Sequence, residues 1–138
     1  MIKDPVLNKS KFRLLLIASL LCICVGAILD VYDERSIAVS ELLATEPQNW
    51  EILLTGLASI IAVIMLAGLF FFKAWARTLY LYSYFPLLLL YLLPSFSWTF
   101  ISGLGAIFYE MGNIFATLIW GMLLLPSLYQ PLFSTNSE

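Results

Sequence analysis

The sequence predicts an all-α integral membrane protein whose four transmembrane helices form two antiparallel hairpins. Hydrophobic residues make up 62% of the 138 residues and charged residues only 12%, whereas soluble domains are about 45–50% apolar and about 25% charged. Four apolar stretches follow one another along the chain, and each approaches the roughly 20 residues that a helix needs to cross a bilayer. The length accommodates one domain, so we expect a single four-helix unit over residues 1–138.

The first transmembrane helix is expected at about 14–32. A basic arm precedes it, and residues 14–29 carry no charge. This pattern is also typical of a secretory signal peptide, with small residues at 25–27 as a cleavage site. Extension of the apolar run to Tyr32, with Asp30 at the membrane interface, gives the length of a full span. We therefore expect an uncleaved helix.

An acidic outer loop is expected at about 33–51, before a second helix at about 52–72. Six of the nine acidic residues lie between Asp30 and Glu51, and residues 36–43 could form a short helix along the membrane surface. Because acids crowded at 30–34 without a glycine turn do not match a calcium loop, we expect a solvated acidic edge there and no metal site.

The third and fourth helices are expected at about 78–93 and 104–125. A short basic turn at 73–77 precedes the third helix, and Pro86 should kink that helix. The chain after Pro126 is expected to be a short polar tail.

The basic residues predict the topology. Six of the seven lie in the N-terminal arm or in the turn at 73–77, which an even number of crossings places on the same side. Because basic residues concentrate in cytoplasmic loops, we expect both termini in the cytoplasm and the acidic loop outside. The expected location is the plasma membrane, of the bacterial inner-membrane type, with a multi-pass topology.

Glu110 is the one charged residue in the apolar interior of the predicted spans. Asn113 and Thr117 follow at i+3 and i+7, so a helix would carry a carboxyl, an amide and a hydroxyl along one face. Such an intramembrane polar site could line a proton or cation path, or bind a partner helix. In the alternative interpretation the helix begins near Asn113, and Glu110 then lies among the outer headgroups near a helix N-terminus, where the dipole favours a carboxylate.

Small residues on the same helix predict close helix packing. Gly112 with Ala116, and Thr117 with Gly121, form pairs spaced by four residues, a pattern that lets helix backbones approach closely. The contact could lie within the bundle of this chain or with another chain.

Tyrosines could form a face of the third helix. Tyr80, Tyr84 and Tyr91 are spaced i, i+4 and i+11, and the hydroxyl of Tyr91 could meet Glu110. Interfacial anchoring is the ordinary role of such tyrosines, and lining a site for a quinone-like ligand is the alternative.

The residue inventory argues against catalysis. Histidine is absent and the net charge is -2, and the chain carries no nucleophile elbow, phosphate-binding loop, zinc motif or haem motif. We therefore expect no enzyme activity, no catalytic residue, no cofactor, no metal and no nucleic-acid partner.

The leading functional hypothesis is a non-catalytic accessory, assembly or interaction subunit of a membrane complex. Its partners would be the lipid bilayer and other membrane-protein chains, or a second copy of itself. The alternative is a small proton- or cation-coupled transporter or channel that uses Glu110.

Overall fold

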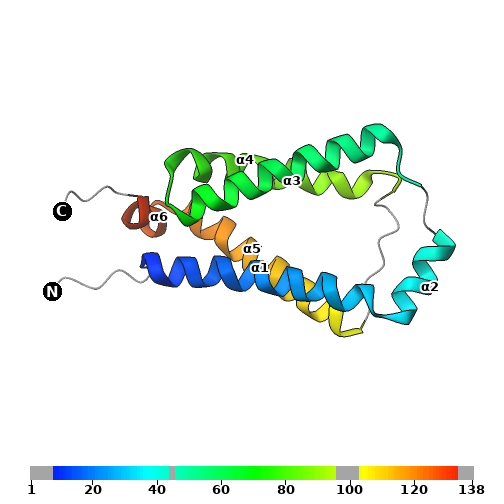
Figure 1. Ribbon diagram of the computed structural model, residues 1–138. Helices are drawn as coiled ribbons and strands as arrows, with labels where there is room; N and C mark the ends of the chain where they lie inside the picture. The colour runs from blue at the N-terminus through cyan, green and yellow to red at the C-terminus, as the bar shows by residue number, and fades with distance from the viewer. Residues whose placement is uncertain (1–7, 44–45, 96–102, 134–138) are drawn as a thin grey trace.

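The chain folds into helices throughout the part that the structure describes. A computed structural model describes residues 8–43, 46–95 and 103–133. Its elements are α1 (Lys9–Val31), α2 (Glu34–Leu43), α3 (Asn49–Phe70), α4 (Ala74–Leu88), the 3-10 helix η1 (Leu89–Leu92), α5 (Gly103–Leu124) and α6 (Pro126–Phe133) (Figure 1). The prediction of an all-helical chain is confirmed.

Three helices are long and apolar enough to cross a membrane. They are α1, α3 and α5, with 23, 22 and 22 residues, which indicates a multi-pass membrane protein. The helix expected at 78–93 is instead divided, because α4 has 15 residues and tightens into η1 three residues after Pro86. A proline removes one backbone donor, and its ring crowds the preceding turn. This accounts for the change from an α-helix to a 3-10 helix shortly after Pro86.

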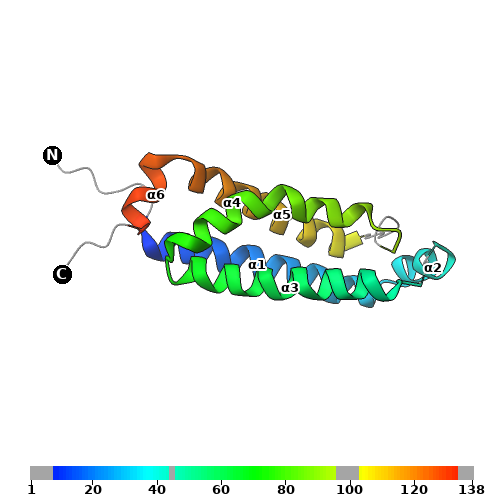
Figure 2. The ribbon, with the colours of Figure 1, turned by 90° about the horizontal axis from the view of Figure 1, so that it is seen from above.

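The closest helix pair joins α1 to α5 rather than two consecutive long helices. These two helices run antiparallel and diverge toward the start of α1, while α3 and α4 form a second pair (Figures 1 and 2). The expected hairpins join the first helix to the second and the third to the fourth. The structure instead packs the first long helix on the last and α3 on α4, so the expected pairing is wrong.

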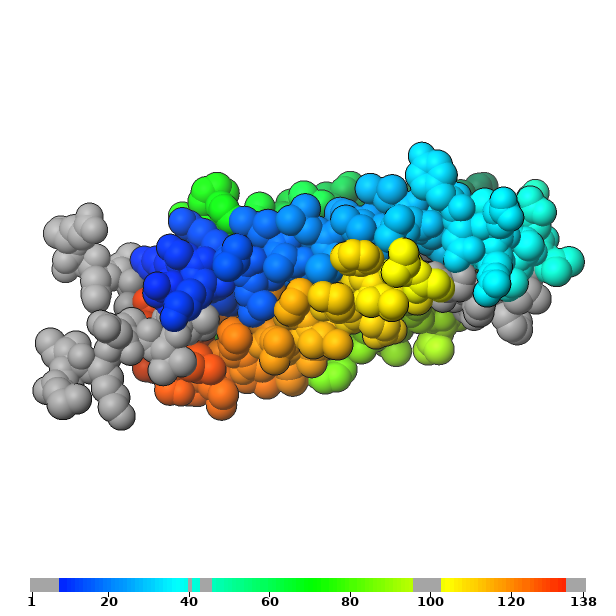
Figure 3. All heavy atoms as spheres, turned by 90° about the horizontal axis from the view of Figure 1, so that it is seen from below, coloured from blue at the N-terminus to red at the C-terminus, as the bar shows by residue number. Residues whose placement is uncertain are grey.

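Glycines explain the close α1–α5 contact. A Cβ atom added to Gly26 would lie 2.9 Å from the backbone nitrogen of Tyr109 and 3.0 Å from the carbonyl oxygen of Gly105. One added to Gly112 would lie 2.5 Å from the side chain of Ile23. Atoms of the two helices lie side by side along the face drawn in Figure 3. Because these glycines lack side chains, the two backbones can approach closely, as small residues commonly allow between membrane helices.

Buried apolar side chains gather at the end of the bundle where α1 begins, which we call the basic end. They come from the start of α1, the end of α3, the start of α4, the end of α5 and α6: Phe12, Leu16, Met65, Leu69, Ala76, Tyr80, Ile119, Leu123 and Leu132. The segment expected to be a polar tail contributes Leu132, which is 1% exposed. That expectation is wrong because residues 126–133 form the helix α6 (Figure 2), whose Leu132 is buried in this core.

Two arginines tie helix ends together at the basic end. The Nε of Arg13 donates to the carbonyl oxygen of Phe70 at 3.1 Å, and the Nε of Arg77 donates to that of Leu123 at 3.1 Å. The last carbonyls of a helix lack intrahelical partners and carry the negative end of its dipole. Each arginine therefore stabilises the C-terminal end of a neighbouring long helix, α3 in one case and α5 in the other.

The opposite end of the bundle, which we call the acidic end, carries α2 and the start of α3. The short helix expected at 36–43 is confirmed as α2, and the Asp33 carboxylate caps it by accepting from the backbone nitrogen of Arg35 at 3.0 Å. Glu51 is only 1% exposed, and its carboxylate accepts from the backbone nitrogen of Ser95 at 3.2 Å and from the Ser95 hydroxyl. One acid of the loop expected at 33–51 is therefore buried, and it holds α3 to the segment after η1.

Candidate functional site

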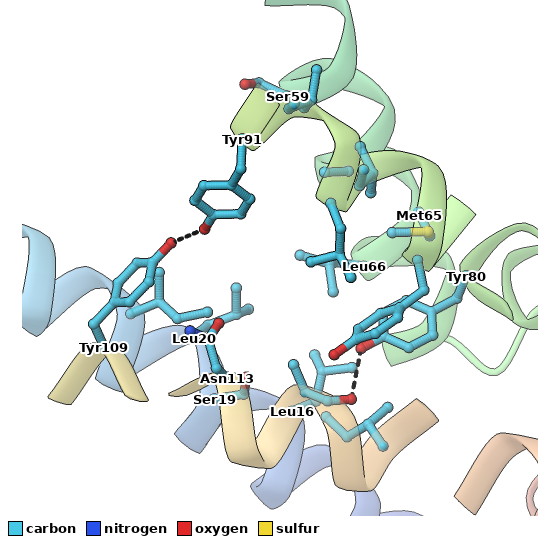
Figure 4. A pocket seen from close by; sticks show the side chains of 18 residues that line it. Leu16, Ser19, Leu20, Ser59, Met65, Leu66, Tyr80, Tyr91, Tyr109 and Asn113 are labelled. Carbon is cyan, nitrogen blue, oxygen red and sulfur yellow. Dashed lines mark hydrogen bonds between the residues drawn. The ribbon is translucent and has the colours of Figure 1, made fainter. Parts of the chain in front are cut away.

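A cavity lies between the α1–α5 pair and the α3–α4 pair. Its volume is about 510 Å³, and its wall includes side chains from α1, α3, α4, η1 and α5. Aliphatic chains such as Leu16, Leu20, Met65 and Leu66 form most of the wall (Figure 4). The cavity adjoins the basic-end core, since Leu16 and Met65 belong to both.

Tyrosines connect α4 and η1 to α5 beside this cavity. The hydroxyl of Tyr80 donates to the carbonyl oxygen of Ala116 at 3.1 Å, and that of Tyr84 lies 2.9 Å from the Thr117 hydroxyl. Tyr91 and Tyr109 are hydrogen-bonded through their hydroxyls (Figure 4). The expected tyrosine face exists, but Tyr91 meets Tyr109 rather than Glu110, because adjacent residues of a helix point about 100° apart.

Replacement of Tyr80 by phenylalanine should destabilise the fold by about 1 kcal/mol. The hydroxyl is the one group lost, and a typical intramolecular hydrogen bond contributes about 0.5–1.5 kcal/mol. Tyr82→Phe is the matched control, because Tyr82 is 78% exposed. Unfolding of both variants in mixed detergent micelles measures the difference, and equal stabilities would contradict a contribution from the Tyr80–Ala116 bond.

Asn113 of α5 lines the cavity and lies close to Ser19 of α1 in Figure 4. Its backbone carbonyl accepts from the Thr117 hydroxyl at 2.9 Å. Its side-chain amide makes no hydrogen bond with any residue in the described ranges. The hydroxyl of Ser19 is already engaged, since it donates to the carbonyl oxygen of Gly112 at 2.9 Å. The amide therefore offers a donor and an acceptor in a largely apolar space.

Glu110 lies outside the cavity. Because α5 begins at Gly103, Glu110 stands about 10 Å along the helix at about 1.5 Å per residue. The interpretation that the helix begins near Asn113 is wrong. The contacts of Gly26 with Tyr109 and of Gly112 with Ile23 place Glu110 level with the stretch of α1 between Ile23 and Gly26, in the half of α1 nearer the acidic end. Its side chain is exposed, and within the described part of the chain the carboxylate has no ion pair or hydrogen bond.

The three polar side chains expected along one face of α5 therefore lie in different surroundings. Glu110 is exposed, Asn113 lines the cavity, and Thr117 is exposed and bonded to Tyr84. These residues share one side of the helix, but that side borders both the cavity and the outer surface of the bundle.

The small residues of α5 also differ in their surroundings. Gly112 is buried against α1, and the carbonyl oxygen of Ala116 accepts from the Tyr80 hydroxyl. A Cβ atom added to Gly121 would meet nothing within 4 Å. The α1–α5 contact also involves Ser19, Gly26 and Gly105, which the sequence analysis did not single out.

The signal that could have identified these contact residues is a seven-residue spacing. Ser19 and Gly26 are seven apart on α1, as are Gly105 and Gly112 on α5, and residues seven apart share one helix face.

Metal-binding clusters and disulfides are absent from the described residues. No three His, Cys, Asp or Glu side chains lie together there, and Cys22 and Cys24 are free thiols. Comparison with protein-family models, with the curated proteins and with the solved structures found no match to this chain.

Proposed function

We propose that the protein is a non-catalytic interaction subunit of a membrane complex and that it contacts another chain through α5 around Glu110. The observation that carries this proposal is an exposed carboxyl, without an ion pair in the described part of the chain, that lies within a long apolar helix and level with residues 23–26 of α1. A charged side chain within a membrane helix is unfavourable, by about 2.5–3.5 kcal/mol at the helix centre and by less nearer its end. A donor on a neighbouring helix would offset that cost.

The surroundings of Glu110 suit a helical partner. Ile107 and Ile114, one turn before and after it, are 56% and 57% exposed. With Leu104, Met111 and Leu118 they form an exposed apolar seam spaced by three and four residues, which is the spacing of helix-contact positions. We infer that the partner is a transmembrane helix of a different chain, with a lysine, arginine or other hydrogen-bond donor opposite Glu110.

The proposed topology has four crossings, with α4 and η1 together as the fourth. Its support is that α4 and η1 run beside α3 (Figures 1 and 2). The chain would leave both ends in the cytoplasm of a cell whose plasma membrane is of the bacterial inner-membrane type. The starts of α1 and α4 lie at the same end of the bundle (Figure 1). Lys9, Lys11 and Arg13 belong to the first of these and Lys73 and Arg77 to the turn and first residues of the second, which supports this orientation.

The mass of the native assembly tests the proposed function. Extraction in mild detergent should yield a complex in which a second chain accompanies this protein in fixed ratio. Glu110→Leu and Ile114→Trp should each release that chain. Ile60→Trp should retain it, because Ile60 is 58% exposed on the surface of α3. A lone monomer, or a partner retained in both α5 variants, would contradict the proposal.

Coupled transport through Glu110 has less support. The glutamate does not line the cavity between the helix pairs, so an ion path through that cavity would bypass it. Flux into proteoliposomes that contain the purified chain, compared with the Glu110→Gln variant, separates the two functions. Glutamate-dependent flux by the isolated chain would favour transport.

A further inference from the structure

We propose that the cavity between the two helix pairs binds one neutral amphipathic lipid. Its hydrocarbon chain would occupy the aliphatic part of the cavity beside Leu16 and Leu66. Its uncharged, oxygen-bearing head group would bind at Asn113, Tyr91 and Tyr109. This site is separate from the proposed contact at Glu110 and does not depend on a partner chain.

Size and lining favour a hydrocarbon ligand. The cavity of about 510 Å³ falls in the range of about 300–1,000 Å³ that small-molecule sites occupy. Most lining residues are leucine, isoleucine, methionine or alanine. A water molecule needs two to four polar partners, so water does not suit the part near Leu16 and Leu66, whereas an acyl or prenyl chain does.

The polar groups favour a head group that both donates and accepts. The Asn113 side chain is half-buried and its amide has no hydrogen bond within the described ranges, so it can both donate to and accept from a ligand. Tyr91 and Tyr109 share one hydrogen bond between two hydroxyls. A phenol hydroxyl can both donate and accept, so this pair presents two polar oxygens beside the Asn113 amide.

The absence of charge from the lining defines the head group further. No Lys, Arg, Asp or Glu is among the described residues that line the cavity. A phosphate or carboxylate head would be taken out of water without a counter-charge, which is strongly unfavourable. A carbonyl or hydroxyl head carries no such penalty.

Access from the side of the bundle is consistent with a lipid. Leu20, Leu88 and Tyr91 line the cavity and are also 37%, 47% and 44% exposed. The cavity therefore reaches the outer surface between the helix pairs. The closely packed α1–α5 face lies on another side (Figure 3).

Photolabelling of the isolated, purified chain tests this site. The probe is a monoacylglycerol with a diazirine in its acyl chain, added to the protein in detergent micelles. The expected result is labelling of cavity residues that excess unlabelled monoacylglycerol suppresses and the ionised fatty acid of equal chain length does not. Equal competition by the fatty acid would overturn the assignment of a neutral head group.

Variants distinguish the cavity from the lipid-facing surface. Asn113→Leu should reduce labelling about tenfold through the lost head-group bonds, and Ala62→Phe, which fills the cavity, should abolish it. Ile60→Phe on the surface of α3 is the matched control and should label like the wild type. Circular dichroism verifies that each variant is folded, and if Ala62→Phe unfolds, Asn113→Leu decides. Undiminished labelling of folded Asn113→Leu, or labels spread evenly over exposed residues, would overturn the proposal.

Discussion

Gly26→Leu should separate α1 from α5 and destabilise the fold by about 3 kcal/mol or more, at or above the upper end of the usual cost of an overpacked core. The atoms that a new Cβ would meet are backbone atoms of Tyr109 and Gly105, at 2.9 and 3.0 Å. A side chain can rotate away from such a clash, whereas a helix backbone can only move as a whole. The substitution therefore acts on the entire α1–α5 contact. Thermal unfolding followed by circular dichroism in detergent micelles measures the loss.

Gly121→Leu provides the matched control for this substitution. It introduces the same side chain into a long helix, but a Cβ atom at Gly121 would meet nothing within 4 Å. Because glycine is about 1 kcal/mol less favourable than alanine or leucine within a helix, this variant should equal or exceed the wild type in stability. Equal destabilisation by both substitutions would contradict a specific role for the α1–α5 contact.

Arg13→Gln should destabilise the protein by about 2–4 kcal/mol. The variant loses the bond from Nε to the carbonyl oxygen of Phe70 and the position of the guanidinium 5.0 Å from the rings of Phe70 and Phe72. Hydrogen bonds of charged groups contribute about 1.5–3 kcal/mol, and cation–π contacts about 0.5–1 kcal/mol each at exposed sites. The same detergent unfolding assay measures the effect.

Lys11→Gln removes one positive charge from the same turn of α1 and serves as the control. Its side chain is exposed, so its loss should change stability little. Arg13→Lys should fall between the two, because it keeps the charge but lacks the planar fork of the guanidinium. A shared effect of Arg13→Gln and Lys11→Gln would show that charge alone is responsible.

The helices themselves were predictable because the length of each apolar stretch can be counted in the sequence. The expected fourth helix, at 104–125, differs from α5 by one residue at each end. The first helix begins five residues before its expected start at about 14, so it includes basic residues of the N-terminal arm. It begins at Lys9, where Asn8 provides a cap by accepting from the backbone nitrogen of Lys11 at 2.8 Å. Asparagine is a favoured helix cap, so this signal was present in the sequence.

The arrangement of the helices was not predictable in the same way. Hydropathy contains no information on which long helix packs on which, and the α1–α5 contact depends on Gly26 meeting Gly105 from a distant part of the chain. The contacts within the candidate site were difficult to predict for a related reason. Whether Tyr91 meets Tyr109 or Glu110 depends on a rotation of α5 by one residue, and the spacing of residues within one helix does not define its rotation against another.

The one-sided core gives the bundle the geometry of a lever. The buried side chains that join the helix pairs, such as Phe12, Leu69 and Leu123, lie at the basic end. Nearer the acidic end, the hydrogen bond between Tyr91 and Tyr109 joins the pairs and would have to break before they could separate. The bond of Glu51 to Ser95 holds α3 to the segment after η1, within one pair. A rotation of about 10° around the basic end would displace the far end of a helix about 30 Å long by about 5 Å. Small rearrangements of packing around Phe12 would thus be magnified at the opposite end of the molecule.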